Sequence, residues 1–193
     1  TDTASLDAAL KDAGNVDGVL QLTPPGANLV LTGPVGGSTD GLSLDGQAGM
    51  VLGNSTFRLM DMGATGLGGV ANIEMSNGRT TGNGGALLAG GLSAGIVNSA
   101  FRGNQAANGG GVYLSGNFNG GIRTNIHFDR NTAAGGNGGG VYVGGSFSGG
   151  IRGLNGDAHF DSNTAGGQGG GMYVAGAFSG DVSANYFADN KAG

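Results

Sequence analysis

The sequence predicts an all-β fold, a right-handed parallel β-helix (solenoid) that begins with a short N-terminal capping helix. Three observations support this prediction. A Phe-x-x-Asn phrase recurs at Phe101, Phe128, Phe160 and Phe187. A glycine-rich phrase alternates with it. Cysteine and tryptophan are absent and only 8 Phe and 4 Tyr are present, so the core must be thin and regular and no disulfide can hold it.

Glycine supplies 47 of the 193 residues, a share that without a period is typical of a disordered, low-complexity segment. Here the glycines recur with the Phe-x-x-Asn phrase. Corners between short strands need positive φ or close backbone approach, and glycine provides both without steric cost. We therefore interpret the glycines as corners of one repeated structural unit.

The first 81 residues predict a cap followed by strands. Residues 5–14 have the pattern of a short amphipathic helix with Ser5 as its N-cap, and we assign residues 1–17 to a cap. Residues 18–81 hold short apolar pieces between turn residues, and their alternation favours strands in irregular first coils. The pieces are residues 18–22, 27–33, 42–46, 55–62 and 71–77.

Residues 82–193 form the repeat coils. The Phe of the recurring phrase steps by 27, 32 and 27 residues. The positions that match Asn83 are Asn108, Asn137 and Gln168. A unit of this size, made of several short strands, fits one coil of a parallel β-helix, with the unequal steps taken up by loops. Residues 74–77 read as a degenerate first copy in which Glu74 takes the place of Phe.

Strand alternation predicts which side chains fill the core. If Ile126 and Phe128 point inward, then Asn125, His127 and Asp129 point outward. Asn131 then falls where the strand ends. We expect the equivalent Asn residues to tolerate left-handed backbone and to hydrogen-bond from coil to coil.

Two of the repeated phrases resemble tetrapeptides of a known family. They resemble the paired G-G-A-(I/L/V) and F-x-x-N motifs of the chlamydial polymorphic membrane proteins and related autotransporter passengers. Later repeats have glycine at the third place, where that family prefers alanine. The matching residues are Gly84, Gly85, Ala86, Leu87, Phe101, Asn104, Phe128, Asn131, Phe160, Asn163, Phe187 and Asn190.

The resemblance implies a function as well as a fold. In that family the β-helical passenger is exported to the bacterial surface, where it works as an adhesin in virulence. We therefore expect a surface-attached or secreted adhesin, not an enzyme, that needs no cofactor or metal. Its partners would be protein or glycan receptors on host cells or other bacteria. Two alternatives stay open, a β-helical polysaccharide-degrading enzyme and a non-binding structural stalk.

The ends of the chain suggest a piece of a longer polypeptide. The sequence has no initiator Met and no signal-like segment, so we interpret residues 1–193 as a single β-helix domain, a fragment of a longer passenger. The last seven residues do not resemble a cap. We expect the final coil to present unpaired backbone groups over an open apolar core and to associate end to end.

Charge and hydropathy argue against nucleic-acid and membrane partners. The net charge is −5 and no basic cluster is present, so we expect no nucleic-acid binding. No apolar run is long enough to span a bilayer, so we expect no membrane insertion of this fragment.

Two glycine-rich motifs fail their chemical requirements. Residues 135–143 superficially resemble a calcium-binding β-roll repeat, but Gly140, like Gly171 in the next copy, stands where an Asp ligand is needed. The same phrases lack the Gly-Lys-Ser/Thr of a phosphate loop.

The repeated His-Phe-Asp phrases at residues 127–129 and 159–161 are the one place that could mimic a metal or acid–base site. We favour a solvated outer face on which Arg130 offsets the charge of Asp129, because both residue types repeat instead of appearing once in a cleft. Arg123 and Arg152 share a register and are expected to be exposed.

Tyr113, Tyr142 and Tyr173 share a register, with Leu88 in the earliest repeat. Their neighbours on both sides are aliphatic, so alternation leaves open which set faces inward. Whichever set faces outward forms an apolar or aromatic stripe that can bind a partner.

Overall fold

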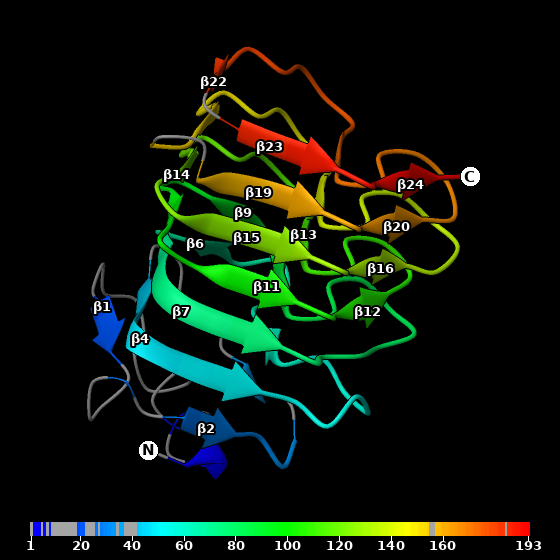
Figure 1. Ribbon diagram of the computed structural model, residues 1–193. Coiled ribbons are helices and arrows are strands. Elements are labelled where there is room, and N and C mark those ends of the chain that lie inside the picture. Colours follow the sequence, from blue (N-terminus) through cyan, green and yellow to red (C-terminus); the bar gives the residue numbers. More distant parts are fainter. Residues whose placement is uncertain are drawn as a thin grey trace.

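A computed structural model shows a parallel β-solenoid, in which successive coils stack on one another (Figure 1). Every strand pair in the described residues is parallel. The prediction of an all-β solenoid is therefore confirmed. The structure describes residues 2–4, 6, 8, 19–21, 26, 28–33, 35–36, 42–154, 157–183 and 185–193.

The regular coils share one order of short strands. The first regular coil contains β8 (Leu87–Ala89), β9 (Gly91–Leu92), β10 (Ile96–Val97), β11 (Ala100–Arg102) and β12 (Gln105–Ala106). The next contains β13 (Val112–Leu114), β14 (Ile122–Arg123), β15 (Ile126–Asp129) and β16 (Thr132–Ala133). Then follow β17 (Val141–Val143), β18 (Ile151–Arg152), β19 (Ala158–Asp161) and β20 (Thr164–Ala165). The last are β21 (Met172–Val174), β22 (Val182–Ser183), β23 (Asn185–Ala188) and β24 (Lys191–Ala192).

The earlier coils contain two longer strands, β4 with 10 residues and β7 with 7. They contain β1 (Val19–Gln21), β2 (Asn28–Val30), β3 (Val35–Gly36), β4 (Ser43–Leu52), β5 (Met60–Asp61), β6 (Gly66–Leu67) and β7 (Val70–Ser76). Strand β7 pairs with both β10 and β11 of the next coil, so one continuous strand passes the corner at which later coils have two. Asn72 and Asn98 lie at this corner with φ of 53° and 45°, a left-handed backbone that Asn tolerates better than most residues.

Two sides of the solenoid carry ladders of repeated outward side chains. We call the strands β11, β15, β19 and β23, with the second half of β7, the Phe-x-x-Asn side. These strands stack in that order in Figure 1. We call the strands β8, β13, β17 and β21 the tyrosine side, which belongs to a six-stranded sheet.

The core is a narrow column of stacked side chains. On β15, Ile126 and Phe128 are buried and His127 and Asp129 are partly exposed, as alternation predicted. The Phe128 ring stacks on Phe101 with centroids 4.9 Å apart and on the next coil with centroids 5.0 Å apart. The same register continues into the early coils as Met75 and Val51.

The core contains a second phenylalanine ladder that was not predicted. Phe118, Phe147 and Phe178 follow one another through isolated bridges, and Phe118 and Phe147 are fully buried. Their ring centroids are 4.7 Å apart. The signal was present, because these residues step by 29 and 31, the same steps as Asn108, Asn137 and Gln168.

Two glycine positions show why the repeat needs this residue. Gly109 has φ of 58°, and a Cβ there would lie 2.4 Å from the carbonyl oxygen of Val112. A Cβ on Gly140, at the third place of its glycine phrase, would lie 2.5 Å from the carbonyl oxygen of Gly171 in the next coil. The contact explains why this coil has glycine where the resembling family has alanine.

Unequal repeat lengths are taken up at two connections. The step from Phe128 to Phe160 is five residues longer than the step from Phe101 to Phe128, yet the ring spacings differ by only 0.1 Å. Two of the five extra residues lie between β16 and β17. The other three lie in the connection from β18 to β19, which has five residues where the connection from β14 to β15 has two. Within it, the N–H of Asp157 donates to the carbonyl of Leu154 at 3.2 Å, and the Leu154 side chain is 60% exposed.

Two local expectations are wrong. Met75, not Glu74, pairs with Phe101, so the degenerate first copy is shifted by one residue and Glu74 points outward. The left-handed residue of each Phe-x-x-Asn phrase is the one before Asn, as at Arg130 with φ of 54°, because the buried Asn must aim its amide along the stack.

The predicted capping helix, residues 5–14, lies mostly outside the described residues. Leu6 is described and is buried in the core. The cap therefore stays a prediction.

Candidate functional site

Most of the predicted motif residues build the core and do not form a surface. Gly84, Gly85, Ala86 and Leu87 are buried, so the first tetrapeptide has a packing role. Phe101, Phe128 and Phe160 are fully buried, and the last Phe of the series, Phe187, is 49% exposed in the final described coil.

The asparagines of the same phrase form a buried amide ladder. The Nδ2 of Asn131 donates to Oδ1 of Asn163 at 3.0 Å and to the carbonyl of Phe101 at 2.8 Å. Its Oδ1 accepts from Nδ2 and from the backbone N–H of Asn104 at 3.0 and 3.1 Å. Asn163 repeats the pattern with Asn190. The amide of Asn131 thus uses its full hydrogen-bonding capacity inside the fold, and the predicted coil-to-coil bonding is confirmed.

The tyrosines face outward, which resolves the alternative that alternation left open. Val112 and Leu114 on either side of Tyr113 are buried, whereas Tyr113 is partly exposed. The rings of Tyr113 and Tyr142 stack with centroids 4.6 Å apart, and Tyr142 and Tyr173 follow at 5.3 Å. Burial, followed by the neighbouring Tyr113 and Tyr173, raises the pKa of Tyr142. Because the rings cover one another's faces, a partner meets their edges and hydroxyl groups.

The His-Phe-Asp phrases also form outward ladders. His127 and His159 pair in register and stack with ring centroids 4.9 Å apart. Asp129 binds Nε of Arg102 in the preceding coil at 3.0 Å. The expected compensation by Arg130 is therefore wrong, because Arg130 follows Asp129 at an exposed left-handed position while Arg102 is its neighbour across the ladder.

Arg102 holds a second carboxylate as well. Its Nη1 lies 2.5 Å from Oε2 of Glu74, one coil further back. One guanidinium therefore links the carboxylates of Glu74 and Asp129 across neighbouring coils.

Arg123 and Arg152 are exposed and in register, as predicted. Nη2 of Arg152 binds Oδ2 of Asp181 at 2.6 Å, and both side chains are more than half exposed. An exposed pair of this kind contributes little to stability.

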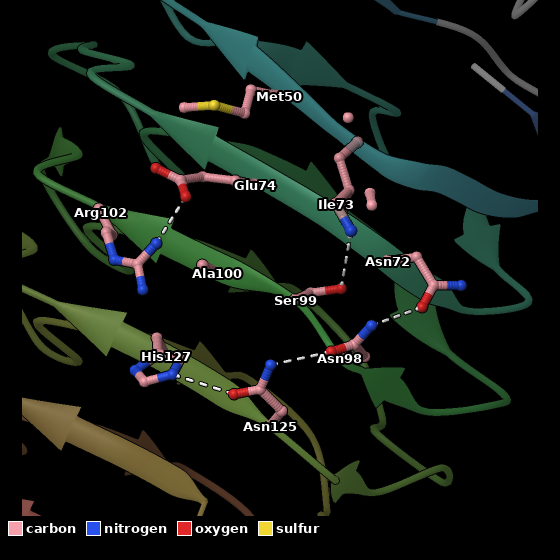
Figure 2. Close-up of a pocket in the computed structure, with 12 residues that line it drawn as sticks. Met50, Asn72, Ile73, Glu74, Asn98, Ser99, Ala100, Arg102, Asn125 and His127 are labelled. Carbon is pink, nitrogen blue, oxygen red and sulfur yellow. Dashed lines mark hydrogen bonds and ion pairs between the residues drawn. The ribbon is translucent and has the colours of Figure 1, made fainter. Parts of the chain in front are cut away.

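A polar hollow on the Phe-x-x-Asn side is the best candidate for a binding site (Figure 2). Its volume is about 330 Å³. Figure 2 shows a row of amides on one side, Glu74 and Arg102 on the other, and Ala100 between them. The lining residues are Ala48, Gly49, Met50, Asn72, Ile73, Glu74, Asn98, Ser99, Ala100, Arg102, Asn125 and His127.

The hollow exists because one outward position is small. Along this register the side chains are Glu74, Ala100, His127 and His159 in successive coils. The methyl group of Ala100 leaves a gap between the longer side chains of its neighbours. The hollow could not be predicted from the sequence, because Ala100 does not belong to the Phe-x-x-Asn phrase. The residues that pair with Ala100 in the adjacent coils are known only when the strand register is known.

The amides beside the hollow form a second ladder. Nδ2 of Asn98 donates to Oδ1 of Asn72 at 2.8 Å, and Nδ2 of Asn125 donates to Oδ1 of Asn98 at 2.9 Å. Asn125 also contacts Nε2 of His127 at 3.2 Å. Unlike the buried ladder, this one is exposed at Asn98 and Asn125, so its remaining hydrogen-bonding capacity faces solvent.

We expect His127 to make stability depend on pH. Burial lowers its pKa below 6.5, Asp129 and Asp157 oppose this, and Arg102 and His159 reinforce it. Below pH 6.5 the unfolded chain then binds more protons than the folded chain. The contribution of neutral His127 to stability is therefore present above pH 6.5 and is lost as the pH falls through the lower folded-state pKa. His127→Gln should lose less stability than the wild type between about pH 7.5 and pH 5 in urea titrations. Equal losses in both proteins would contradict the assignment.

The fold and its outward ladders define the chain as a repeat protein of the parallel β-solenoid class. Comparison with models of known protein families, with curated proteins and with solved structures found no match to this chain. Among the described residues there is no cluster of three or more His, Cys, Asp or Glu that could hold a metal ion. The described part of the chain also contains no helix that is long and apolar enough to cross a membrane.

Proposed function

We propose that this chain is the surface-exposed passenger segment of an autotransporter-like bacterial protein and that it works as an adhesin. Its partners are protein or glycan receptors on host cells or other bacteria, and it acts outside the cell, attached to the outer membrane or secreted. The motif resemblance suggests this role. We also expect the coils to wind in the right-handed sense, as nearly all parallel crossovers do.

The tyrosine ladder is the observation that carries the proposal. Tyr113, Tyr142 and Tyr173 stand in one row on a regular side of the solenoid, each partly exposed. Tyrosine is enriched in interfaces because it combines a large apolar body with a polar tip. A rigid row of identical groups lets several weak contacts act together, which raises the overall affinity.

The test is a cell-binding assay with purified protein. Fluorescent wild-type protein should bind cultured epithelial cells saturably. The triple variant Tyr113→Ser, Tyr142→Ser and Tyr173→Ser should lose most of this binding. Thr132→Ala with Thr164→Ala changes an outward ladder on another side and serves as the matched control. Binding that persists in the tyrosine variant excludes the ladder as the contact surface, and no binding by the wild type favours a structural stalk.

The polysaccharide-degrading enzyme is a weaker candidate. The hollow is lined by His127 and Glu74, and Asp129 lies beside it. Pairs of carboxylates such as Glu74 and Asp129 are the groups that glycan cleavage uses. However, both carboxylates are bound by Arg102, so neither is free to approach a glycosidic oxygen as the proton donor. Release of short glycans from a polysaccharide by the wild type, lost in Glu74→Gln, would favour the enzyme.

We expect the 193-residue chain to self-associate through its C-terminal coil. There β23 and β22 are the end strands of their sheet, and Phe187, Phe178 and Val182 are 49%, 41% and 54% exposed. Unpaired strand edges over apolar side chains favour pairing with another chain. Sedimentation velocity should show dimers whose share grows with concentration.

Variants at the two ends distinguish the contact surface. Val182→Lys adds a charge at the C-terminal coil and should shift the chain to monomers. Val30→Lys, at a 62% exposed position on β2 near the other end, should leave the dimers unchanged. Dimers that survive Val182→Lys would place the contact elsewhere.

A further inference from the structure

We propose that the polar hollow on the Phe-x-x-Asn side is a binding site for a neutral saccharide. It lies on a different sheet from the tyrosine ladder, so the inference goes beyond the proposed function and does not depend on it. The amides of Asn72, Asn98 and Asn125, the floor at Ala100 and the charges around Arg102 carry it.

The amide row supplies alternating donors and acceptors. A side-chain amide has two N–H donors and two acceptor lone pairs. Asn98 uses one donor toward Asn72 and accepts one bond from Asn125, which leaves one donor and one lone pair for a ligand. Asn72 likewise donates once, to Asp45, and accepts once, from Asn98. Sugar hydroxyl groups both donate and accept, so they match such a row.

The floor of the hollow is apolar and smooth. Ala48, Gly49, Met50 and Ala100 are among its lining residues. In Figure 2 Ala100 lies between the amide row and Arg102, and Met50 stands at one end. A saccharide ring has C–H faces as well as hydroxyl edges. An apolar floor beside polar walls suits a ligand with both apolar and polar surfaces. The volume of about 330 Å³ lies at the small end of the range of ligand pockets.

The charges select against other ligands. Glu74 and Arg102 in the lining balance each other, and Asp129 beside the hollow adds a negative charge. The surroundings of the site are therefore net negative and disfavour phosphate, sulfate or uronate groups. A metal cation is disfavoured because the same two carboxylates already bind Arg102. An extended peptide cannot add a strand here, since β7, β11 and β15 are each paired on both sides.

The test measures binding of free monosaccharides to the 193-residue chain. Glucose, galactose and N-acetylglucosamine are titrated separately and followed through the side-chain amide signals in NMR spectra. Ala100→Tyr fills the hollow, and the fold accepts Tyr at this register in β23, where Tyr186 pairs with His159. Leu88→Tyr is the matched control, because it adds the same side chain to the tyrosine side, next to Tyr113.

A second variant removes the amide without filling the hollow. Asn98 has φ of 45°, which glycine adopts readily, so Asn98→Gly keeps the backbone and deletes the side chain. Circular dichroism melting checks that both variants fold, and if Ala100→Tyr does not, Asn98→Gly decides alone.

The expected result is binding of at least one of the three sugars by the wild type and by Leu88→Tyr. Asn98→Gly and folded Ala100→Tyr should bind at least about tenfold more weakly. Glucuronate should bind more weakly than glucose. No binding of any sugar by the wild type, or unchanged binding in Asn98→Gly or Ala100→Tyr, overturns the proposal. Cell binding by the tyrosine variants is measured separately, so either proposal can fail while the other stands.

Discussion

Phe128→Ala should lower the free energy of unfolding by about 3 to 5 kcal/mol, the usual cost of deleting a fully buried aromatic ring. The ring is 0% exposed and is stacked between Phe101 and Phe160 at 4.9 and 5.0 Å. Its loss leaves a cavity whose walls belong to three successive coils. Because each coil repeats the same contacts, the surrounding ladder cannot collapse into the gap without losing register.

The same ladder contains its own control. Phe187 stacks on Phe160 at 4.6 Å but is 49% exposed, so Phe187→Ala removes less buried surface and should cost much less. Urea titrations followed by circular dichroism give both values. If the β signal is lost in one transition, the free energies of unfolding of the two variants can be compared directly. Separate transitions would show that the coils unfold independently. Equal costs for the two variants would contradict the buried stack.

Asn131→Ala should lower the free energy of unfolding about as much as Phe128→Ala does, by roughly 3 kcal/mol or more. The substitution leaves Nδ2 and the backbone N–H of Asn104 without their acceptor and the carbonyl of Phe101 without its amide donor. Each buried polar group left without a partner costs about 1 to 3 kcal/mol. Leucine at this position fills a similar volume but leaves the same groups unsatisfied, so Asn131→Leu should not rescue stability.

The exposed amide ladder provides the comparison for this prediction. Asn125 also bonds to an Asn in the preceding coil, at 2.9 Å, but it is exposed to solvent. Water can replace its partners, so Asn125→Ala should cost less than about 1 kcal/mol. Similar costs for Asn131→Ala and Asn125→Ala would show that burial is not what makes the inner ladder important.

The sequence pattern was sufficient to predict the solenoid and the inward direction of Phe128, because both follow from a period and from strand alternation, which are local properties. It could not place Glu74, since one residue of register shift exchanges the inner and outer faces and is fixed only by pairing with the next coil. The ion pairs of Arg102 were missed for the same reason, because they join residues 27 and 28 positions apart.

The hollow illustrates a different limit. A gap in a surface ladder depends on what stands above and below a residue, and the small Ala100 has no unusual feature of its own in the sequence. The outward direction of the tyrosines was open because valine, leucine and tyrosine all favour strands and all can fill a core. In the structure the aliphatic neighbours Val112 and Leu114 fill the core and the tyrosine faces outward.

The connection between β18 and β19 has a consequence for evolution and for protein engineering. Three extra residues there, with two more between β16 and β17, leave the spacing of the phenylalanine stack unchanged to within 0.1 Å. This corner therefore decouples chain length from the periodic scaffold. Insertions at such a site should cost little in folding, so the connection is free to vary in length and sequence. For the same reason the segment near Leu154 is a suitable place to graft an epitope or a reporter peptide onto the scaffold.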